Sequence, residues 1–158
     1  MDIEISPEEL FHNGAVPADR LSSVSAEWAR DSRVGGVVSF IGVVRADETA
    51  EGIVEAIEFS AYEEMARQET PEMVARIARE IGESAPPDTA PSVLKIHVEH
   101  ALGTVSVGEI AVLIVAAAGH RPEAFTFCRE VLEQLKKEIP IYGKEIFRGE
   151  GHRWKQNR

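Results

Sequence analysis

The chain has 158 residues, of which 44% are hydrophobic and 28% are charged, and its formal net charge is -10. This composition is typical of one soluble globular domain, and the acidic balance opposes binding to nucleic acid or to an anionic membrane. Cys128 is the only cysteine, which excludes an internal disulfide and fits the reducing cytoplasm. The acidic residues 1–10 do not resemble a secretory signal, and the longest apolar run, 110–118, is too short for a membrane helix.

The first half of the chain alternates short strand and helix patterns. A strand is expected over residues 1–5, and Ser6-Pro7-Glu8-Glu9 carries the N-cap, proline and glutamate that start a short helix. Another helix is expected near residues 25–30. Residues 34–44 are rich in Val, Ile and Phe and predict a buried strand, and we expect this strand to pair with the alternating run 53–62.

The second half predicts longer elements. Thr70-Pro71 starts a helix that ends at Gly82, and apolar residues recur in it at helical spacing. A helix is also expected from Pro122 to about Glu138, with Phe125, Cys128, Val131, Leu132 and Leu135 on its buried face. Extended segments are expected over residues 93–100, 110–118 and 139–142.

This order of elements predicts an α+β fold with a largely antiparallel sheet and flanking helices. We see no domain boundary, so residues 1–158 are expected to form one domain, with a flexible C-terminal tail over about 146–158. From Lys136 onward there are seven Lys and Arg residues and three Glu, a net charge of +4. A basic end on an acidic chain is suited to holding a small anion.

The strongest local signal for chemistry is Gly119-His120-Arg121-Pro122, which lies where a strand gives way to a helix. Free backbone N–H groups at a helix start attract anions, and an imidazole and a guanidinium add charged donors. The alternative is structural: His120 caps the helix and Arg121 is a solvated charge. Arg45, at the end of a strand, marks either the exit of the chain to solvent or the lip of a pocket. Lys136, next to the apolar Leu135, is either an acid or base at the edge of the core or a surface lysine.

Other functional classes lack their motifs. No HxxxH or HExxH pair predicts a metal site, and glycine-rich nucleotide loops are absent. No GxSxG elbow indicates a serine hydrolase. Cys128 lies on the apolar face of its predicted helix, so we interpret it as a core residue. We therefore expect neither a metal nor another cofactor.

Six segments, in this order, resemble the MoaE family, the large subunits of molybdopterin synthase. They are Gly35-Gly36-Val37-Val38-Ser39-Phe40-Ile41-Gly42-Val43-Val44-Arg45, Ile57-Glu58-Phe59-Ser60-Ala61-Tyr62-Glu63-Glu64-Met65-Ala66, Val107-Gly108-Glu109, Gly119-His120-Arg121-Pro122-Glu123-Ala124-Phe125, Leu135-Lys136, and Ile139-Pro140-Ile141-Tyr142-Gly143-Lys144-Glu145 with a late Trp154. The resemblance covers nearly the whole chain from Gly35 onward.

The resemblance implies an α/β-hammerhead fold and a cytoplasmic homodimer within a heterotetramer. Each large subunit would bind one small ubiquitin-like MoaD-type subunit, whose C-terminal Gly-Gly tail carries a thiocarboxylate. That tail would enter a pocket and deliver sulfur to cyclic pyranopterin monophosphate. Two rounds of transfer would produce the dithiolene of molybdopterin.

The resemblance also assigns roles to individual residues. Lys136 matches the family's first catalytic lysine and would move protons or stabilise an acyl intermediate. Arg45, His120 and Arg121 match groups that bind the pterin and its phosphate. The substrate-binding set it implies is Val43, Val44, Arg45, His120, Arg121, Lys136, Gly143, Lys144 and Glu145.

Two departures from the family pattern affect these roles. Gly143 stands where the family has its second catalytic lysine, and Lys144 is the next basic residue. A shift of one residue in a strand turns a side chain to the opposite face, so Lys144 is expected to act as the second catalytic lysine only if Gly143 allows a bulge. The family's H-R-x-G is His100-Ala101-Leu102-Gly103 here, without the arginine.

Two alternatives stay open at this point. One is a catalytically weakened MoaE-like module that binds the small subunit or an anionic ligand, which the loss at Gly143 motivates. The other is an unrelated anion-binding enzyme, such as a hydrolase, that uses the pocket of His120 and Arg121.

Overall fold

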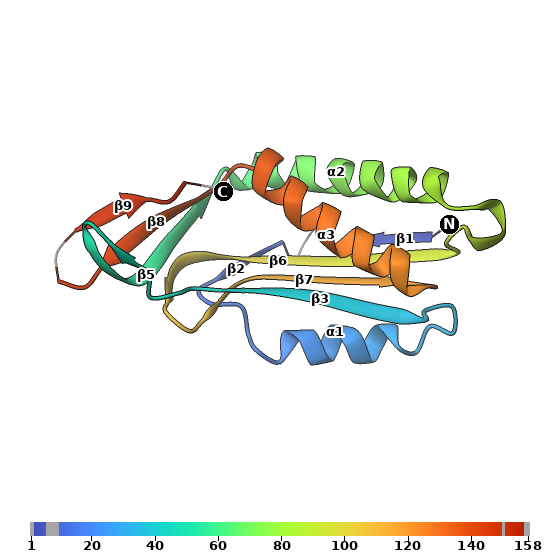
Figure 1. Ribbon diagram of the computed structural model, residues 1–158, viewed down its shortest axis with the longest axis horizontal. Helices are drawn as coiled ribbons and strands as arrows, with labels where there is room; N and C mark the ends of the chain where they lie inside the picture. Colours follow the sequence, from blue (N-terminus) through green and yellow to red (C-terminus); the bar gives the residue numbers. More distant parts are fainter. Residues whose placement is uncertain (1, 6–9, 150, 157–158) are drawn as a thin grey trace.

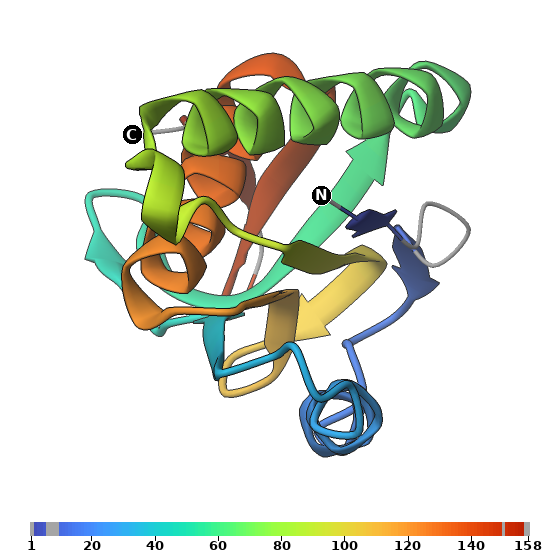
Figure 2. The ribbon, with the colours of Figure 1, turned by 90° about the vertical axis from the view of Figure 1, so that its right-hand side faces the viewer.

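The computed structural model describes residues 2–5, 10–149 and 151–156 and consists of a mostly antiparallel sheet flanked by three α-helices (Figure 1). Helices α2 (Glu63–Ser84) and α3 (Arg121–Glu138) cover one face of the sheet. Helix α1 (Arg20–Trp28) lies against the other face, as the end-on view in Figure 2 shows. The predicted α+β fold with a largely antiparallel sheet is therefore confirmed.

Six strands form the main path of the sheet. In spatial order they are β3 (Gly36–Val43), β7 (Ile110–Ala118), β6 (Val93–Ser106), β5 (Gly52–Ala61), β8 (Ile141–Phe147) and β9 (His152–Trp154). The short strands β1 (Asp2–Ile5) and β2 (Phe11–Asn13) pair with β6 in parallel, and β4 (Glu48–Thr49) pairs with β5. A 3-10 helix, η2 (Pro87–Thr89), follows α2.

Strand β6 belongs to two parts of the sheet. Residues 94–100 pair with β7, whereas residues 103–106 pair with β5. Gly103, where the second pairing begins, has φ of +82°, a conformation that glycine adopts at low cost. As a result β5, β8 and β9 project as a separate ribbon at one end of the molecule (Figure 1).

Strand β7 is buried on both faces and separates two cores. Val112, Ile114 and Ala116 face α2 and α3, whereas Leu113 and Val115 face α1. The run 110–118 is therefore a central strand, as its continuous apolar sequence predicts. Among the helices of the described residues, none is both long and apolar enough to cross a membrane.

The expected pairing between residues 34–44 and 53–62 is wrong. Strand β3 pairs along its whole length with β7, and β5 pairs with β6 and β8. The intervening loop forms its own small hairpin, in which the hydroxyl of Thr49 donates to the carbonyl of Gly52 at 3.0 Å. Strand β3 thus lies beside the apolar β7 and not beside β5.

Helix α2 begins at Glu63 rather than at Thr70, so that Pro71 lies inside the helix, and it continues past Gly82 to Ser84. Proline normally ends or kinks a helix because it lacks an N–H donor. Here the buried stripe extends from Ala66 through Thr70 to Ile81, and packing along this stripe stabilises the helix on both sides of the proline.

The buried face of α3 also differs from the expectation at one position. Phe125 is 61% exposed, whereas Phe127 is fully buried. Cys128, Val131 and Leu135 are buried as expected. The helical spacing does not decide whether Phe125 or Phe127 lies at the edge of the apolar stripe. In the folded protein Phe127 is the one that packs into the core against the sheet.

Two terminal predictions have different outcomes. The short helix expected from Ser6 to Glu9 lies outside the described residues. The expected tail, residues 146–158, contains the end of β8 and the strand β9, which pairs with β8. Helix α1 covers residues 20–28 and begins earlier than the expected residues 25–30.

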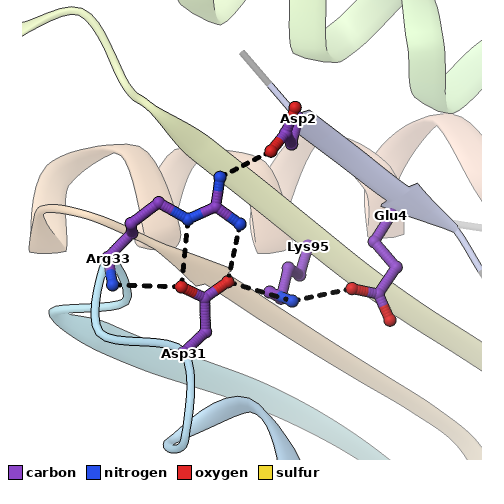
Figure 3. Close-up of polar contacts among 5 residues, drawn as sticks. All are labelled: Asp2, Glu4, Asp31, Arg33 and Lys95. Carbon is purple, nitrogen blue, oxygen red and sulfur yellow. Dashed lines mark hydrogen bonds and ion pairs between the residues drawn. The ribbon is translucent and has the colours of Figure 1, made fainter.

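A network of ion pairs connects β1, the segment after α1, and β6 (Figure 3). The Asp31 carboxylate accepts hydrogen bonds from Nε and Nη2 of Arg33 at 3.0 and 2.9 Å, and Arg33 also contacts Asp2. Lys95 Nζ lies 2.7 Å from Glu4 and 3.3 Å from Asp31. Hydrogen bonds from Arg33 hold the pKa of Asp31 well below its usual value.

Phe127→Ala is expected to lower the free energy of unfolding by about 3 to 5 kcal/mol, because it leaves a cavity in the core between α3 and the sheet. Phe125→Ala, two residues away on the exposed side, should change it by less than about 0.5 kcal/mol. Urea denaturation of both variants measures this difference. Equal losses would contradict the assignment of the buried face.

Asp31→Asn is expected to destabilise the protein at pH 7, because it removes the negative charge and one of the two oxygens that accept the Arg33 hydrogen bonds. The pKa of Asp31 is lower in the folded than in the unfolded chain, so its stabilisation is complete above pH 3.8 and declines as the pH falls further. The difference from wild type should therefore stay constant between pH 7 and pH 5 and shrink below about pH 4 in urea titrations. Asp88→Asn, in η2, is the control, and a pH-independent loss in Asp31→Asn would contradict the ion-pair explanation.

Candidate active site

A cavity of about 150 Å³ lies where the projecting ribbon meets the main sheet, below the C-terminal end of α3. Its apolar walls come from β3, β5, β7, α3 and β8. The lining residues are Phe40, Gly42, Val43, Val44, Ile57, Phe59, His100, Ala111, Val112, Leu132, Leu135, Lys136, Ile141, Tyr142, Gly143 and Lys155. The bend of β6 positions the cavity, because it brings β5 and β8 to the end of β3.

The charged side chains that line the cavity are two lysines. Lys136 is in the last turn of α3, and Lys155 follows β9 directly. No carboxylate is among the described residues that line it. The cavity is therefore suited to an anionic group at the end of a largely apolar ligand, although the chain as a whole is acidic.

His100 of β6 is the third nitrogen-bearing side chain of the cavity. Its Nδ1 lies 2.8 Å from the carbonyl oxygen of Ala101, and its ring meets the edge of Phe59 at 4.9 Å between centroids. Burial, together with the positive charge of Lys136, lowers the pKa of His100 to about 4. The imidazole is therefore neutral at neutral pH, and the positive charge of the lining comes from the lysines.

The cavity brings together part of the predicted site. Val43 and Val44, at the end of β3, line it together with Lys136 and Gly143. Arg45 follows directly, is exposed, and pairs with Asp47 at 3.0 Å. These residues meet because β3 ends beside the last turn of α3, a contact that the spacing in the sequence does not specify.

Lys144 and Glu145 lie outside the lining of the cavity. Lys144 Nζ is 3.1 Å from Oε1 of Glu58, its partner across β5 and β8. Glu145 is buried, and its Oε2 lies 3.5 Å from Nη2 of Arg153 on β9. Both side chains thus take part in cross-strand pairs of the ribbon.

His120 and Arg121 lie at the opposite end of α3 from Lys136. His120 occupies the N-cap position without a side-chain capping hydrogen bond, and both residues are exposed. Arg121 and Lys136 are fifteen residues apart on one helix, a distance of about 22 Å. Within a single chain the two groups therefore cannot contact the same small ligand.

Gly35 and the first residue of β3, Gly36, lie against this start of α3. A Cβ atom at Gly35 would lie 2.2 Å from the carbonyl oxygen of Gly119, and one at Gly36 would lie 3.8 Å from Cα of Arg121. Only glycine fits at position 35 without a shift of the backbone. Strand β3 therefore runs from the His120 and Arg121 end of the molecule to the cavity.

Most of the apolar lining was not predicted as part of the site, and neither were the two nitrogen-bearing side chains of His100 and Lys155 or the ring of Phe59. For His100 and Lys155 a weak signal existed. His100 belongs to the H-x-x-G segment before the bend, and Lys155 belongs to the basic C-terminal segment. Neither signal specifies that the residue faces a cavity, because this depends on the pairing of β5, β6, β8 and β9.

No cluster of His, Cys, Asp or Glu side chains within the described part of the chain has the geometry of a metal site. His97 and Glu99 form a buried polar pair, in which Nε2 of His97 and Oε2 of Glu99 are 3.0 Å apart. Nε of Arg20 lies 2.9 Å from the same oxygen of Glu99. Cys128 is buried in the core, and this burial raises the pKa of its thiol. A buried thiol with a raised pKa is a poor nucleophile.

Comparison with known proteins identifies relatives over most of the chain. Residues 17–138 match the family described as MoaE protein. A molybdopterin synthase catalytic subunit from Oryza sativa subsp. indica is 36% identical over 132 residues, which cover 84% of this chain and 62% of the rice protein. The molybdopterin synthase catalytic subunit of Pyrococcus abyssi is 35% identical over 123 residues, covering 78% of this chain and 75% of that protein.

Solved structures share the fold. Molybdopterin synthase from Staphylococcus aureus superposes with a TM-score of 0.71 at 26% identity, covering 94% of this chain and 97% of that one. A complex of subunits 1 and 2 of molybdopterin-converting factor from Helicobacter pylori gives a TM-score of 0.72 at 19% identity, covering 99% and 91%. Sequence and fold agree over the same residues, and the chain belongs to the MoaE family.

Proposed function

We propose that this protein is the catalytic subunit of a cytoplasmic molybdopterin synthase, which transfers sulfur from a thiocarboxylated small subunit to cyclic pyranopterin monophosphate. The observation that carries the proposal is the apolar cavity whose charged lining consists of lysines. The names of the rice and Pyrococcus relatives support it. The chain spans 62% of the length of the rice relative.

The lining of the cavity supports binding of the tail of a small ubiquitin-like subunit. An extended Gly-Gly segment has no side chains and fits between apolar walls such as Phe40, Phe59 and Ile141. Its terminal thiocarboxylate is an anion, which the ammonium group of Lys136 attracts. The Helicobacter pylori structure is itself a complex of two subunits of a related factor, which supports a partner of this kind.

In the proposed reaction the sulfur of the thiocarboxylate attacks a pterin carbon that carries an oxygen substituent; the carbon–sulfur bond forms, the carbon–oxygen bond breaks, and the oxygen group leaves with a proton. Water then cleaves the bond between this sulfur and the acyl carbon of the tail, which leaves the sulfur on the pterin and a carboxylate on the small subunit. Negative charge develops on the acyl oxygen during cleavage. Lys136 would stabilise that charge and donate a proton, as a general acid in an apolar site can.

His120 and Arg121 can contribute to the same active site as Lys136 if the protein is a homodimer. Strand β3 is an edge strand with partly exposed apolar side chains at Val37, Ile41 and Val43. An uncovered apolar edge of this kind favours pairing with a second copy. In a two-fold antiparallel pair of β3 strands, the Arg121 end of one protomer would lie beside the cavity of the other.

This arrangement would give each cavity a second anion-binding group for the substrate phosphate. The start of α3 offers free backbone N–H groups, and Arg121 adds a guanidinium suited to phosphate. Arg45 follows the cavity residues Val43 and Val44, so it would lie near the junction of the two protomers. A catalytically weakened module that only binds the small subunit is the second candidate, motivated by Gly143.

Lys136→Ala is expected to lower kcat/KM for conversion of cyclic pyranopterin monophosphate to molybdopterin by about 10²- to 10⁴-fold, because the general acid is lost. Lys137→Ala is the matched control, since Lys137 is the next residue of α3 and lies outside the cavity lining. The assay uses the purified chain with a thiocarboxylated small subunit. Tight binding of the small subunit with no product from wild type would favour the docking module instead.

A shared active site is tested by mixing variants. Lys136→Ala and Arg121→Ala homodimers should each be inactive or weak, whereas co-expressed chains should recover about a quarter of the wild-type activity. Recovery occurs because one site of each mixed dimer then receives intact Lys136 from one protomer and intact Arg121 from the other. Absence of recovery in mixed dimers, isolated through two different affinity tags, would show that both residues act within one chain, and full activity of the Arg121→Ala homodimer would show that Arg121 is dispensable.

A further inference from the structure

We propose that Lys155 is the second lysine of the active site and that, with Lys136, it binds the terminal carboxylate or thiocarboxylate of the small subunit's tail. This inference rests on the proposed function for the identity of the ligand. The placement of Lys155 rests on the geometry of β8 and β9 alone.

The register of the ribbon places Lys155 opposite Gly143. Strands β8 and β9 pair Lys144 with Trp154 and Glu145 with Arg153. The next pair in this register joins Gly143 to residue 155, and the N–H of Lys155 donates to the carbonyl oxygen of Gly143 at 2.8 Å. Opposed residues of antiparallel strands project from the same face of the sheet.

That shared face is the one that borders the cavity. Gly143 and Lys155 both line it. A Cβ atom at Gly143 would lie 3.1 Å from Cγ2 of Ile57 and 3.2 Å from Cε1 of Phe59, which are lining residues too. Gly143 thus faces the cavity without a side chain. The amine beside it belongs to Lys155, which follows the neighbouring strand β9.

Lys144 does not occupy the same space. It lies one residue further along β8, and its side chain projects from the opposite face. Its ammonium is 3.1 Å from the carboxylate of Glu58. Gly143 pairs in regular register with Phe59, and the one irregularity between β5 and β8 lies between Val54 and Ala56, so no bulge redirects Lys144.

The charge arrangement fits one terminal anion. Lys136 and Lys155 approach from α3 and from the end of β9, and the lining contains no carboxylate among the described residues. His100 is neutral at neutral pH, because burial lowers its pKa to about 4. Two ammonium groups can each donate to one of the two terminal atoms of a carboxylate or thiocarboxylate.

The test measures binding of a synthetic peptide that ends in Gly-Gly with a free carboxylate, and of the same peptide as its C-terminal amide, by isothermal titration calorimetry with the full chain. Lys155→Met should weaken binding of the carboxylate peptide about tenfold and leave the amide peptide unchanged. Lys155→Arg, which keeps the charge, should lose less. Lys137→Met, which removes a lysine of α3 outside the cavity lining, is the matched charge control and should bind both peptides as wild type does.

Three results would overturn the proposal: equal binding of the carboxylate peptide by Lys155→Met and wild type, equal weakening of both peptides in that variant, or no preference of wild type for the carboxylate. Sulfur transfer is assayed separately. If wild type is inactive but the carboxylate effect of Lys155 is present, the proposed function fails and the anion site stands. If wild type is active and Lys155→Met is equally active, the assignment of Lys155 as an active-site lysine fails.

Discussion

The structure depends on the double pairing of β6. Its first part must pair with β7 and its last part with β5, because backbone N–H and C=O groups in a buried strand require partners. Gly103 allows the strand to change direction between these two pairings. The bend separates the ribbon of β5, β8 and β9 from the main sheet, and the cavity lies at the junction.

The cavity concentrates positive charge in a chain whose net charge is -10. One lysine comes from the last turn of α3 and the other from the end of the ribbon, and both lie beside apolar walls. Where water is partly excluded, a charge acts on an anion more strongly than it does on an open surface. The cavity is therefore suited to an anion although the chain as a whole is acidic.

Strand β3 connects the two ends of the molecule that carry candidate anion-binding groups. It begins against Gly119 and the first residues of α3 and ends at the cavity with Val43. Its edge is not covered by another strand within the described chain. A second copy paired along this edge would unite groups that lie about 22 Å apart in one protomer, so dimerisation and activity would be coupled.

The sequence by itself determined the fold class, the family, and most elements, because the apolar periodicity of 110–118 and 122–138 and the order of the motifs are local properties. It also indicated that position 143 is a glycine, where the family has its second catalytic lysine. Only the tertiary structure decided that β3 pairs with β7, that α2 continues through Pro71, and that Phe127 rather than Phe125 is buried. It likewise placed Lys155 beside Gly143. These features depend on contacts between residues far apart in the chain, which periodicity and local propensity do not specify.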